Sequence, residues 1–209
     1  MGLAQEWFKL GDVPEGVELE PFVAGIVAER LFRGTFGVRF VDNQLWEFIA
    51  VLRAHRRGEG SDDRQLLQEV LPNPAFVWLR RRDTVAQAVS YVKARQTNQW
   101  WSAGADAPGV RPVFDFEAID ERVAGIVQNN EAWKRWFDES GITALEVDYE
   151  VLNASPVDET RRVLEFLGIE PPRSRAIREQ SARQRNAVDD DWVARYRAIA
   201  GVQIGRAHV

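Results

Sequence analysis

An arginine and a serine at one predicted strand–helix junction are the residues best suited to chemistry in this sequence. Arg82 follows the apolar run Ala75–Leu79, and such runs are typical of a strand buried on both faces of a parallel sheet. Asp83 can cap the helix that follows, and Ser90 lies almost two turns further on, on the same helix face. Ligands of open α/β sheets bind beyond the carboxyl ends of the strands. Arg82 and Ser90 could therefore hold one phosphate, as a charged fork and a neutral donor.

A structural interpretation of the same pair stays open. Arg82 could pair with a carboxylate, and Ser90 could be a small residue of the interior. The basic residues leave a similar choice, because lysine occurs at only three positions and the other 24 of the 27 are arginine. A planar guanidinium suits phosphate and sulfate, but GC-rich codon usage would give the same bias.

Other catalytic sites are poorly supported. The phosphate-binding motif of nucleotide kinases, Gly-x-x-x-x-Gly-Lys-Ser/Thr, is absent, and so is any Gly-Lys pair. A Ser-His-Asp hydrolase is disfavoured because His55 is the one histidine before the last six residues. The run Asp189-Asp190-Asp191 could suggest a metal, but adjacent side chains diverge around a helix, so we expect these residues to cap the helix that carries Trp192. Without cysteine there is no thiolate ligand, and we expect no metal site.

Alternating helices and strands must position the junction. Helical spacing of apolar residues predicts helices over residues 20–32, 43–55, 66–71, 83 onward, 115–138 and 156–167, and a last helix around 192–199. Apolar alternation or continuous apolar runs predict strands over residues 36–41, 74–80 and 142–147. This order predicts an α/β fold with a mainly parallel sheet, in a single domain over residues 1–203.

Composition limits the class of protein. The formal charge of −5 argues against nucleic-acid binding, which needs a basic surface. No apolar run approaches the roughly 20 residues that span a bilayer, and no signal-peptide pattern is present, so we expect a cytoplasmic protein without membrane insertion. Residues 204–209 match the translation of a common sequencing adapter, and we expect them to be a non-native tail.

The run from Arg82 to Ser90 resembles the 3′-phosphate motif of sulfotransferases, which use 3′-phosphoadenosine 5′-phosphosulfate (PAPS). The continuation Ala94–Trp100 is similar to the bacterial trehalose sulfotransferase family in particular. Further segments resemble that family in the same order: Gln5-Glu6-Trp7-Phe8, Gly37 to Gln44, Val147 to Glu150, and Asp191 to Arg197. The resemblance covers about residues 4 to 200.

The resemblance implies a three-layer α/β fold of the P-loop NTPase-like sulfotransferase type and transfer of a sulfuryl group from PAPS to a hydroxyl of a sugar or glycolipid such as trehalose. It implies Glu6 as the catalytic base. PAPS would contact Arg82, Ser90, Arg183 and Arg185, and the acceptor would contact Arg39, Gln96 and Trp100. Trp100 and Trp101 could instead cap a core. A homodimer is compatible with the resemblance.

The sequence departs from the family pattern at the N-terminus. Sulfotransferases begin with a strand and a Ser/Gly-rich loop whose backbone N–H groups wrap the 5′-phosphosulfate, whereas Met1–Ala4 runs directly into Gln5-Glu6. We therefore expect the first strand and the 5′-phosphosulfate loop to be missing. Two hypotheses follow: a PAPS-dependent sulfotransferase, or an inactive sulfotransferase-like fragment that binds a 3′-phosphonucleotide or a protein partner without catalysis.

Overall fold

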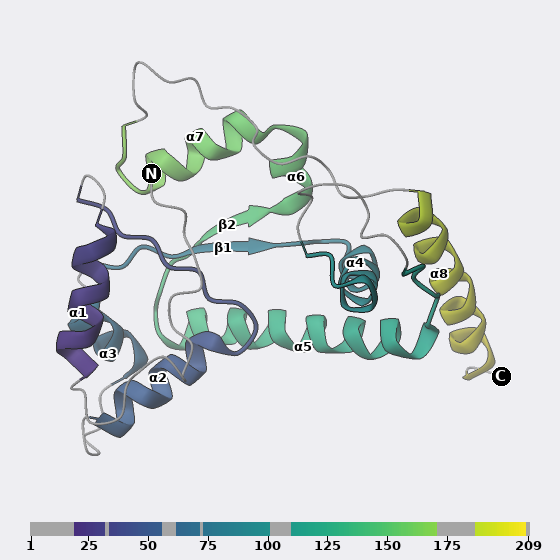
Figure 1. The fold of residues 1–209 in the computed structure, drawn as a ribbon, viewed down its shortest axis with the longest axis horizontal. Coiled ribbons are helices and arrows are strands. Elements are labelled where there is room, and N and C mark those ends of the chain that lie inside the picture. The colour runs from purple at the N-terminus through teal and green to yellow at the C-terminus, as the bar shows by residue number, and fades with distance from the viewer. Residues whose placement is uncertain are drawn as a thin grey trace. The chain divides into compact units, whose positions relative to one another are not determined.

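The computed structural model describes residues 19–31, 34–55, 62–71, 73–100, 110–170 and 187–207. They fall into two compact units, one of Met1–Ala75 with Phe137–Ile142 and the other of Phe76–Trp136 with Thr143–Val209. The elements, labelled in Figure 1, are α1 (Leu19–Arg30), α2 (Gln44–His55), α3 (Asp63–Val70), β1 (Val77–Arg80), α4 (Thr84–Thr97), α5 (Phe116–Glu139), β2 (Leu145–Asp148), α6 (Tyr149–Ala154), α7 (Pro156–Phe166) and α8 (Ala187–Ala207).

The first unit is built on α1, α2 and α3. Its buried apolar side chains recur at helical spacing, which explains why these segments form helices; they are Val23, Leu45, Phe48, Ile49, Leu52, Leu66 and Leu67. Asp62 caps α3, because its carboxylate accepts a hydrogen bond from the Gln65 N–H at 2.8 Å. The helices predicted in this part of the chain are confirmed.

The predicted strand over residues 36–41 is wrong. Within this range the structure has one isolated bridge residue, Val38, and another, Thr35, comes just before it. The Phe40 ring stacks on the Phe48 ring of α2, with 5.8 Å between their centroids. Phe40 of this segment therefore packs against a helix.

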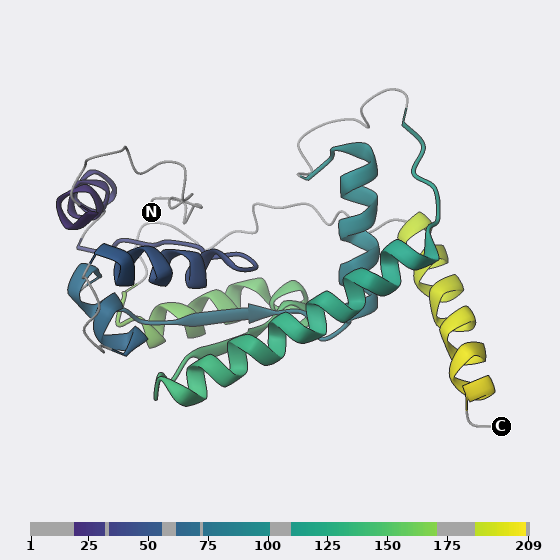
Figure 2. The same ribbon diagram turned by 90° about the horizontal axis from the view of Figure 1, so that it is seen from below.

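In the second unit, β1 and β2 pair in parallel with Val77 opposite Leu145 and Arg80 opposite Asp148. These two strands make up the sheet within the described residues. Burial of β1 on both faces, which its apolar run predicted, is wrong: the Val77 and Leu79 side chains are 39% and 56% exposed. An apolar run predicts the strand but not how many elements cover it. Figures 1 and 2 show α5 on one side of the strand pair and α7 on the other.

The core of the second unit lies among α4, α5 and α8. Its fully buried residues come from all three helices: Ala86, Ala88, Val89, Val92, Ile119, Ile126, Trp192, Val193 and Tyr196. α4 and α8 lie side by side in both ribbon views (Figures 1 and 2). The Tyr196 hydroxyl donates to Asp120 Oδ1 at 2.6 Å, and its ring stacks on Phe116.

The start of α8 differs from the prediction. The helix begins at Ala187, so Asp189 and Asp190 lie in its first turn instead of capping it. Asp189 Oδ1 pairs with Lys93 Nζ of α4 at 2.5 Å, which gives this carboxylate a structural role. α8 continues to Ala207 and so enters the segment 204–209, whose non-native origin stays a prediction.

Together the described residues form a mixed α/β structure with a small parallel sheet, as the sequence predicted. The three-layer arrangement and the single domain over residues 1–203 stay predictions. Across the described segments, no helix combines the length and the apolar character needed to cross a membrane.

Candidate functional site

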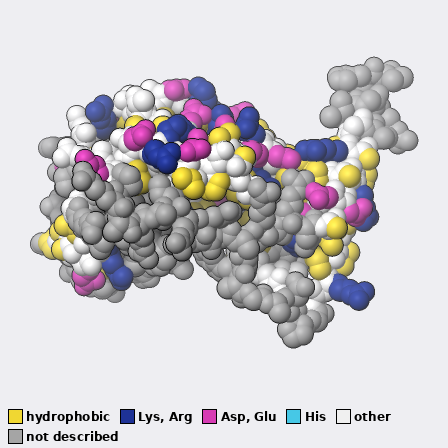
Figure 3. Space-filling view, turned by 90° about the horizontal axis from the view of Figure 1, so that it is seen from above, with side chains coloured by type: hydrophobic (Ala, Val, Ile, Leu, Met, Phe, Trp, Pro, Cys, Tyr) yellow, Lys and Arg dark blue, Asp and Glu magenta, His cyan; other side chains and the backbone are white. Residues whose placement is uncertain are grey.

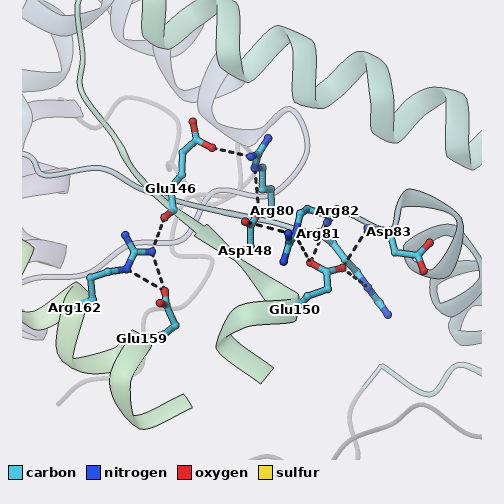
Figure 4. Close-up of polar contacts among 9 residues, drawn as sticks. All are labelled: Arg80, Arg81, Arg82, Asp83, Glu146, Asp148, Glu150, Glu159 and Arg162. Carbon is cyan, nitrogen blue, oxygen red and sulfur yellow. Dashed lines mark hydrogen bonds and ion pairs between the residues drawn. The ribbon is translucent and has the colours of Figure 1, made fainter. Parts of the chain in front are cut away.

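The carboxyl ends of β1 and β2 bring charged residues together. Arg82 and Asp83 follow β1, while Asp148 ends β2 and leads into α6. Asp83 caps α4 as predicted, since its Oδ1 accepts from the Ala86 N–H at 3.0 Å. Because the strands are parallel, both chain segments leave the sheet at the same edge. Figure 4 shows their side chains gathered there.

Glu150 joins the two segments. Its Oε2 accepts a hydrogen bond from the Arg82 N–H at 3.1 Å, and its Oε1 accepts one from the Asp83 N–H at 3.2 Å. Burial acts to raise the pKa of this carboxyl, but the backbone donors and the nearby Arg81 guanidinium outweigh it and hold the pKa below its ordinary value. An ionised carboxylate therefore closes the turn between β1 and α4.

Arg82 is held loosely. Its Nε lies 3.6 Å from Asp148 Oδ2 and 3.9 Å from Glu150 Oε2, and the side chain is 57% exposed. Both distances exceed the usual length of an N–H···O hydrogen bond. None of the hydrogen bonds found among the described residues uses the Arg82 guanidinium. The group thus keeps donors available to an outside anion.

The two preceding arginines are more firmly engaged. Arg80 pairs with Glu146 at 3.0 Å and with Asp148 at 3.3 Å, and its guanidinium lies 5.3 Å from the Trp78 ring centroid. Arg81 is only 19% exposed and lies 4.7 Å from the centre of the Tyr149 ring. Arg82 is therefore the arginine of this run that is most open to a ligand.

Acidic and basic side chains are interspersed on the described surface that Figure 3 shows. On α7, Arg161 pairs with Asp158 and Arg162 pairs with Glu159, each at 2.8 Å. Arg162 also donates to the Glu146 carbonyl at 2.7 Å. Many arginines are thus matched by carboxylates, so their abundance in the sequence does not by itself indicate anion sites.

Ser90 is partly buried on α4. In the sequence it follows the buried Ala88 and Val89 and precedes the buried Val92. The described contacts do not join its hydroxyl to the Arg82 guanidinium. A shared anion would have to bridge the two side chains. Their joint role on a phosphate stays a prediction.

Gln96, predicted to contact the acceptor, is used within the fold. Its Nε2 donates to the Val113 carbonyl at 2.9 Å, and its Oε1 accepts from the Val113 N–H at 2.7 Å. Both ends of the amide therefore fasten the segment before α5 to α4. Trp100 is 46% exposed and packs edge-on against Tyr91. The Arg122 guanidinium lies over the Tyr91 ring, 3.9 Å from its centroid.

The structure places part of the predicted site. Arg82, Ser90, Gln96 and Trp100 all belong to the second unit, whereas Arg39 is an exposed residue of the first unit. Glu6, Arg183, Arg185 and Trp101 lie outside the described residues. In the part of the chain that is described, no group of three or more His, Cys, Asp or Glu residues could hold a metal ion.

Sequence reasoning missed the roles of Asp148 and Glu150. The segment Val147 to Glu150 was noted for its resemblance alone, and no contact was assigned to it. Two acidic residues at the end of a second parallel strand were the available signal, since neighbouring parallel strands bring their carboxyl ends to one edge.

Comparison with known proteins identifies the family. Residues 25–199 match the family described as Stf0 sulphotransferase. A trehalose 2-sulfotransferase of Mycobacterium tuberculosis is 32% identical over 171 residues, which are 80% of this chain and 62% of that protein. A trehalose 2-sulfotransferase of Mycolicibacterium smegmatis is 32% identical over 129 residues, 61% of this chain and 47% of that protein. The chain thus spans less than two thirds of the length of either relative. Because the family match extends over most of the sequence, the chain belongs to the Stf0 sulphotransferase family.

Proposed function

We propose that this chain carries the 3′-phosphonucleotide site of a PAPS-dependent sulfotransferase whose acceptor is a sugar or glycolipid hydroxyl. The observation that supports the proposal most directly is the position of Arg82: it follows a parallel strand, is 57% exposed, and has no hydrogen bond from its guanidinium to another described residue. Trehalose is the acceptor named for the two relatives, and we propose the same class of acceptor here.

When bound, PAPS supplies the sulfuryl group that passes to the acceptor hydroxyl. Arg82 and Ser90 would hold the 3′-phosphate, the first by a charged fork and the second by a hydroxyl. Glu6 would accept the proton of the acceptor hydroxyl, and Arg183 and Arg185 would lie over the nucleotide. Arg39 and Trp100 would contact the sugar, whereas Gln96 uses both ends of its amide on Val113.

The carboxylates around Arg82 do not prevent this role. An ion pair that is more than half exposed contributes about 0–1 kcal/mol, and the two pairs of Arg82 are longer than hydrogen bonds. A bidentate arginine–phosphate contact is shorter and stronger. The two interpretations left open by the sequence are therefore compatible, because Arg82 can rest against Asp148 and still turn its outer donors to a phosphate.

Isothermal titration with adenosine 3′,5′-bisphosphate and adenosine 5′-monophosphate tests the site. We expect the bisphosphate to bind more tightly, and Arg82→Ala to weaken its binding by about 10-fold or more, since hydrogen bonds to charged groups contribute about 1.5–3 kcal/mol. Arg161→Ala is the matched control, because Arg161 is also about half exposed and pairs with a carboxylate. We expect it to bind like the unmodified chain.

Three outcomes separate the hypotheses. A folded chain that does not distinguish the two nucleotides, or whose binding ignores Arg82→Ala, contradicts the proposed site. Selective binding together with sulfation of trehalose by labelled PAPS supports the enzyme. Selective binding without transfer to any sugar favours the inactive fragment.

A further inference from the structure

The Glu150 carboxylate contacts three consecutive residues of the β1–α4 turn. Its Oε2 accepts from the Arg82 N–H at 3.1 Å and lies 3.9 Å from the Arg82 Nε. Its Oε1 accepts from the Asp83 N–H at 3.2 Å and lies 3.9 Å from the Arg81 Nε. Figure 4 shows this carboxylate between the arginines. One side chain from α6 thus fixes the backbone of residue 82 by a hydrogen bond and also lies beside the Nε of its guanidinium.

Asp148 supplies a second anchor on the same side of Arg82. Its Oδ2 lies 3.6 Å from the Arg82 Nε, while its Oδ1 faces the Arg80 Nε at 3.3 Å. The closest contacts of Arg82 with both carboxylates are therefore made by Nε. The two terminal nitrogens at the far end of the guanidinium are the donors suited to a bidentate contact with an anion.

Such restraint bears on affinity. A free arginine side chain loses rotamer entropy when a ligand immobilises it. When the backbone of residue 82 is already fixed and two carboxylates attract the Nε of its side chain, less freedom remains to be lost, so part of that cost is removed from binding. The negative charge of Glu150 is itself balanced by two backbone donors and Arg81, which limits its repulsion of a phosphate.

We propose that Glu150 is a positioning residue of the nucleotide site, which fixes the β1–α4 turn and directs the Arg82 guanidinium toward the 3′-phosphate. This inference rests on the proposed function and adds a residue to it. Glu150 acts through Arg82 and does not touch the nucleotide.

Glu150→Gln tests this role. The amide has nearly the same shape but no charge, and it offers one acceptor where the carboxylate offers two, so one backbone N–H loses its partner. We expect affinity for adenosine 3′,5′-bisphosphate to fall several-fold, by no more than Arg82→Ala lowers it because Glu150 acts through Arg82, while affinity for adenosine 5′-monophosphate stays unchanged. Glu159→Gln is the matched control, because Glu159 is also a carboxylate held by an arginine, Arg162 of its own helix, and we expect it to change neither affinity.

A double-mutant cycle distinguishes positioning from general support of the fold. If Glu150 acts through Arg82, Glu150→Gln should have little further effect on bisphosphate affinity once Arg82 is alanine. Equal losses for both nucleotides, or losses that add fully to those of Arg82→Ala, overturn the positioning role while the nucleotide site stands. If Arg82→Ala itself leaves bisphosphate affinity unchanged, the proposed function fails whatever Glu150→Gln does.

Glu150→Asp keeps the proposal testable if Glu150→Gln does not fold. The aspartate retains the charge, but it is one methylene shorter and cannot reach both backbone donors. We expect it to lower the ratio of bisphosphate to monophosphate affinity. An unchanged ratio in folded Glu150→Asp would show that the carboxylate does not position Arg82.

Discussion

Arg80, Arg81 and Arg82 are identical in type and adjacent in sequence, yet each has a different environment. Arg80 is paired with Glu146, Arg81 is tucked against Tyr149, and Arg82 is more than half exposed. The sequence could select Arg82, because it follows the strand. It could not show Glu146 beside Arg80 or Tyr149 beside Arg81, since these partners lie more than 60 positions away along the chain and only the fold brings them close.

Gln96 shows that residue type can suggest a polar contact without showing which group it is made with. Its type and its place in the family-like run Ala94–Trp100 predicted a contact with the acceptor, but both ends of its amide are bonded to Val113. A side chain that fastens a neighbouring segment and one that binds a sugar use the same donors and acceptors. Residue type therefore predicts a polar contact without identifying the partner.

Tyr196 gives a prediction that concerns a single side chain. Burial, the hydrogen bond to Asp120 and the charge of that carboxylate together raise the pKa of Tyr196 to about 12. Because the folded state holds the phenolic proton more tightly, this contribution to stability is complete below the ordinary pKa of 10.0 and is lost as the pH rises from there toward 12.

Titration followed by tyrosinate absorbance should show one of the three tyrosines ionising near pH 12. We expect Tyr196→Phe to remove that step, and Asp120→Asn to move it to lower pH, because the charge is lost while the burial remains. The assignment is wrong if Tyr196→Phe instead removes a step at the ordinary pKa of tyrosine.

At the scale of elements, helices were easier to predict than strands. The expected helix over residues 115–138 is α5, Phe116–Glu139, and the one over residues 43–55 is α2, Gln44–His55. A helix closes its hydrogen bonds within its own segment, so a long apolar stripe is enough to predict it. A strand needs a partner from elsewhere, and residues 36–41 have a single isolated bridge residue, Val38, instead of a paired strand.

Two residues that face each other on the paired strands differ in burial, and comparing their variants tests which part of the sheet is covered. Val147 and Leu79 are register partners on neighbouring strands, but Val147 is 3% exposed and Leu79 is 56% exposed. We expect Val147→Ala to lower the free energy of unfolding by about 2 kcal/mol, because it removes two buried methyl groups and leaves a small cavity. Leu79→Ala should cost no more than about 0.5 kcal/mol, as exposed substitutions do.

Urea denaturation of the two variants measures the difference. Leu79 lies on the same strand as the candidate site, so its variant also shows whether a change in β1 disturbs folding for reasons other than burial. Equal losses in the two variants would mean that the outer side of β1 is covered in solution, contrary to the exposure seen in the structure.

At the scale of the whole molecule, the second unit is assembled from distant segments. α8 supplies Trp192 and Tyr196 to a core shared with α4 and α5, and polar contacts join it to α4 and to Asp83, the residue that caps α4. Lys93 of α4 pairs with Asp189, and the Arg197 guanidinium donates to Asp83 Oδ1 at 2.9 Å. Since Asp83 is next to Arg82, α8 also contacts the turn that carries the candidate site. The apolar stripe of α8 predicted that one face would be buried, but the partner helices could not be read from the sequence.

Two truncations test this dependence on α8. A chain that ends at residue 186 lacks Trp192, Val193 and Tyr196, each of which is at most 6% exposed. Burial of a large apolar side chain contributes about 1.5–3 kcal/mol, and a domain has only about 5–15 kcal/mol in total. We expect this chain to lose cooperative thermal unfolding of the second unit, followed by circular dichroism, and to bind a hydrophobic dye. A chain that ends at Gln203 keeps all three residues and lacks only the predicted non-native tail, so it should melt like the full chain.

If the shorter chain also melts like the full chain, α8 does not hold the core of α4 and α5 together. If the longer one is destabilised, residues 204–209 contribute to the fold and are not a dispensable tail.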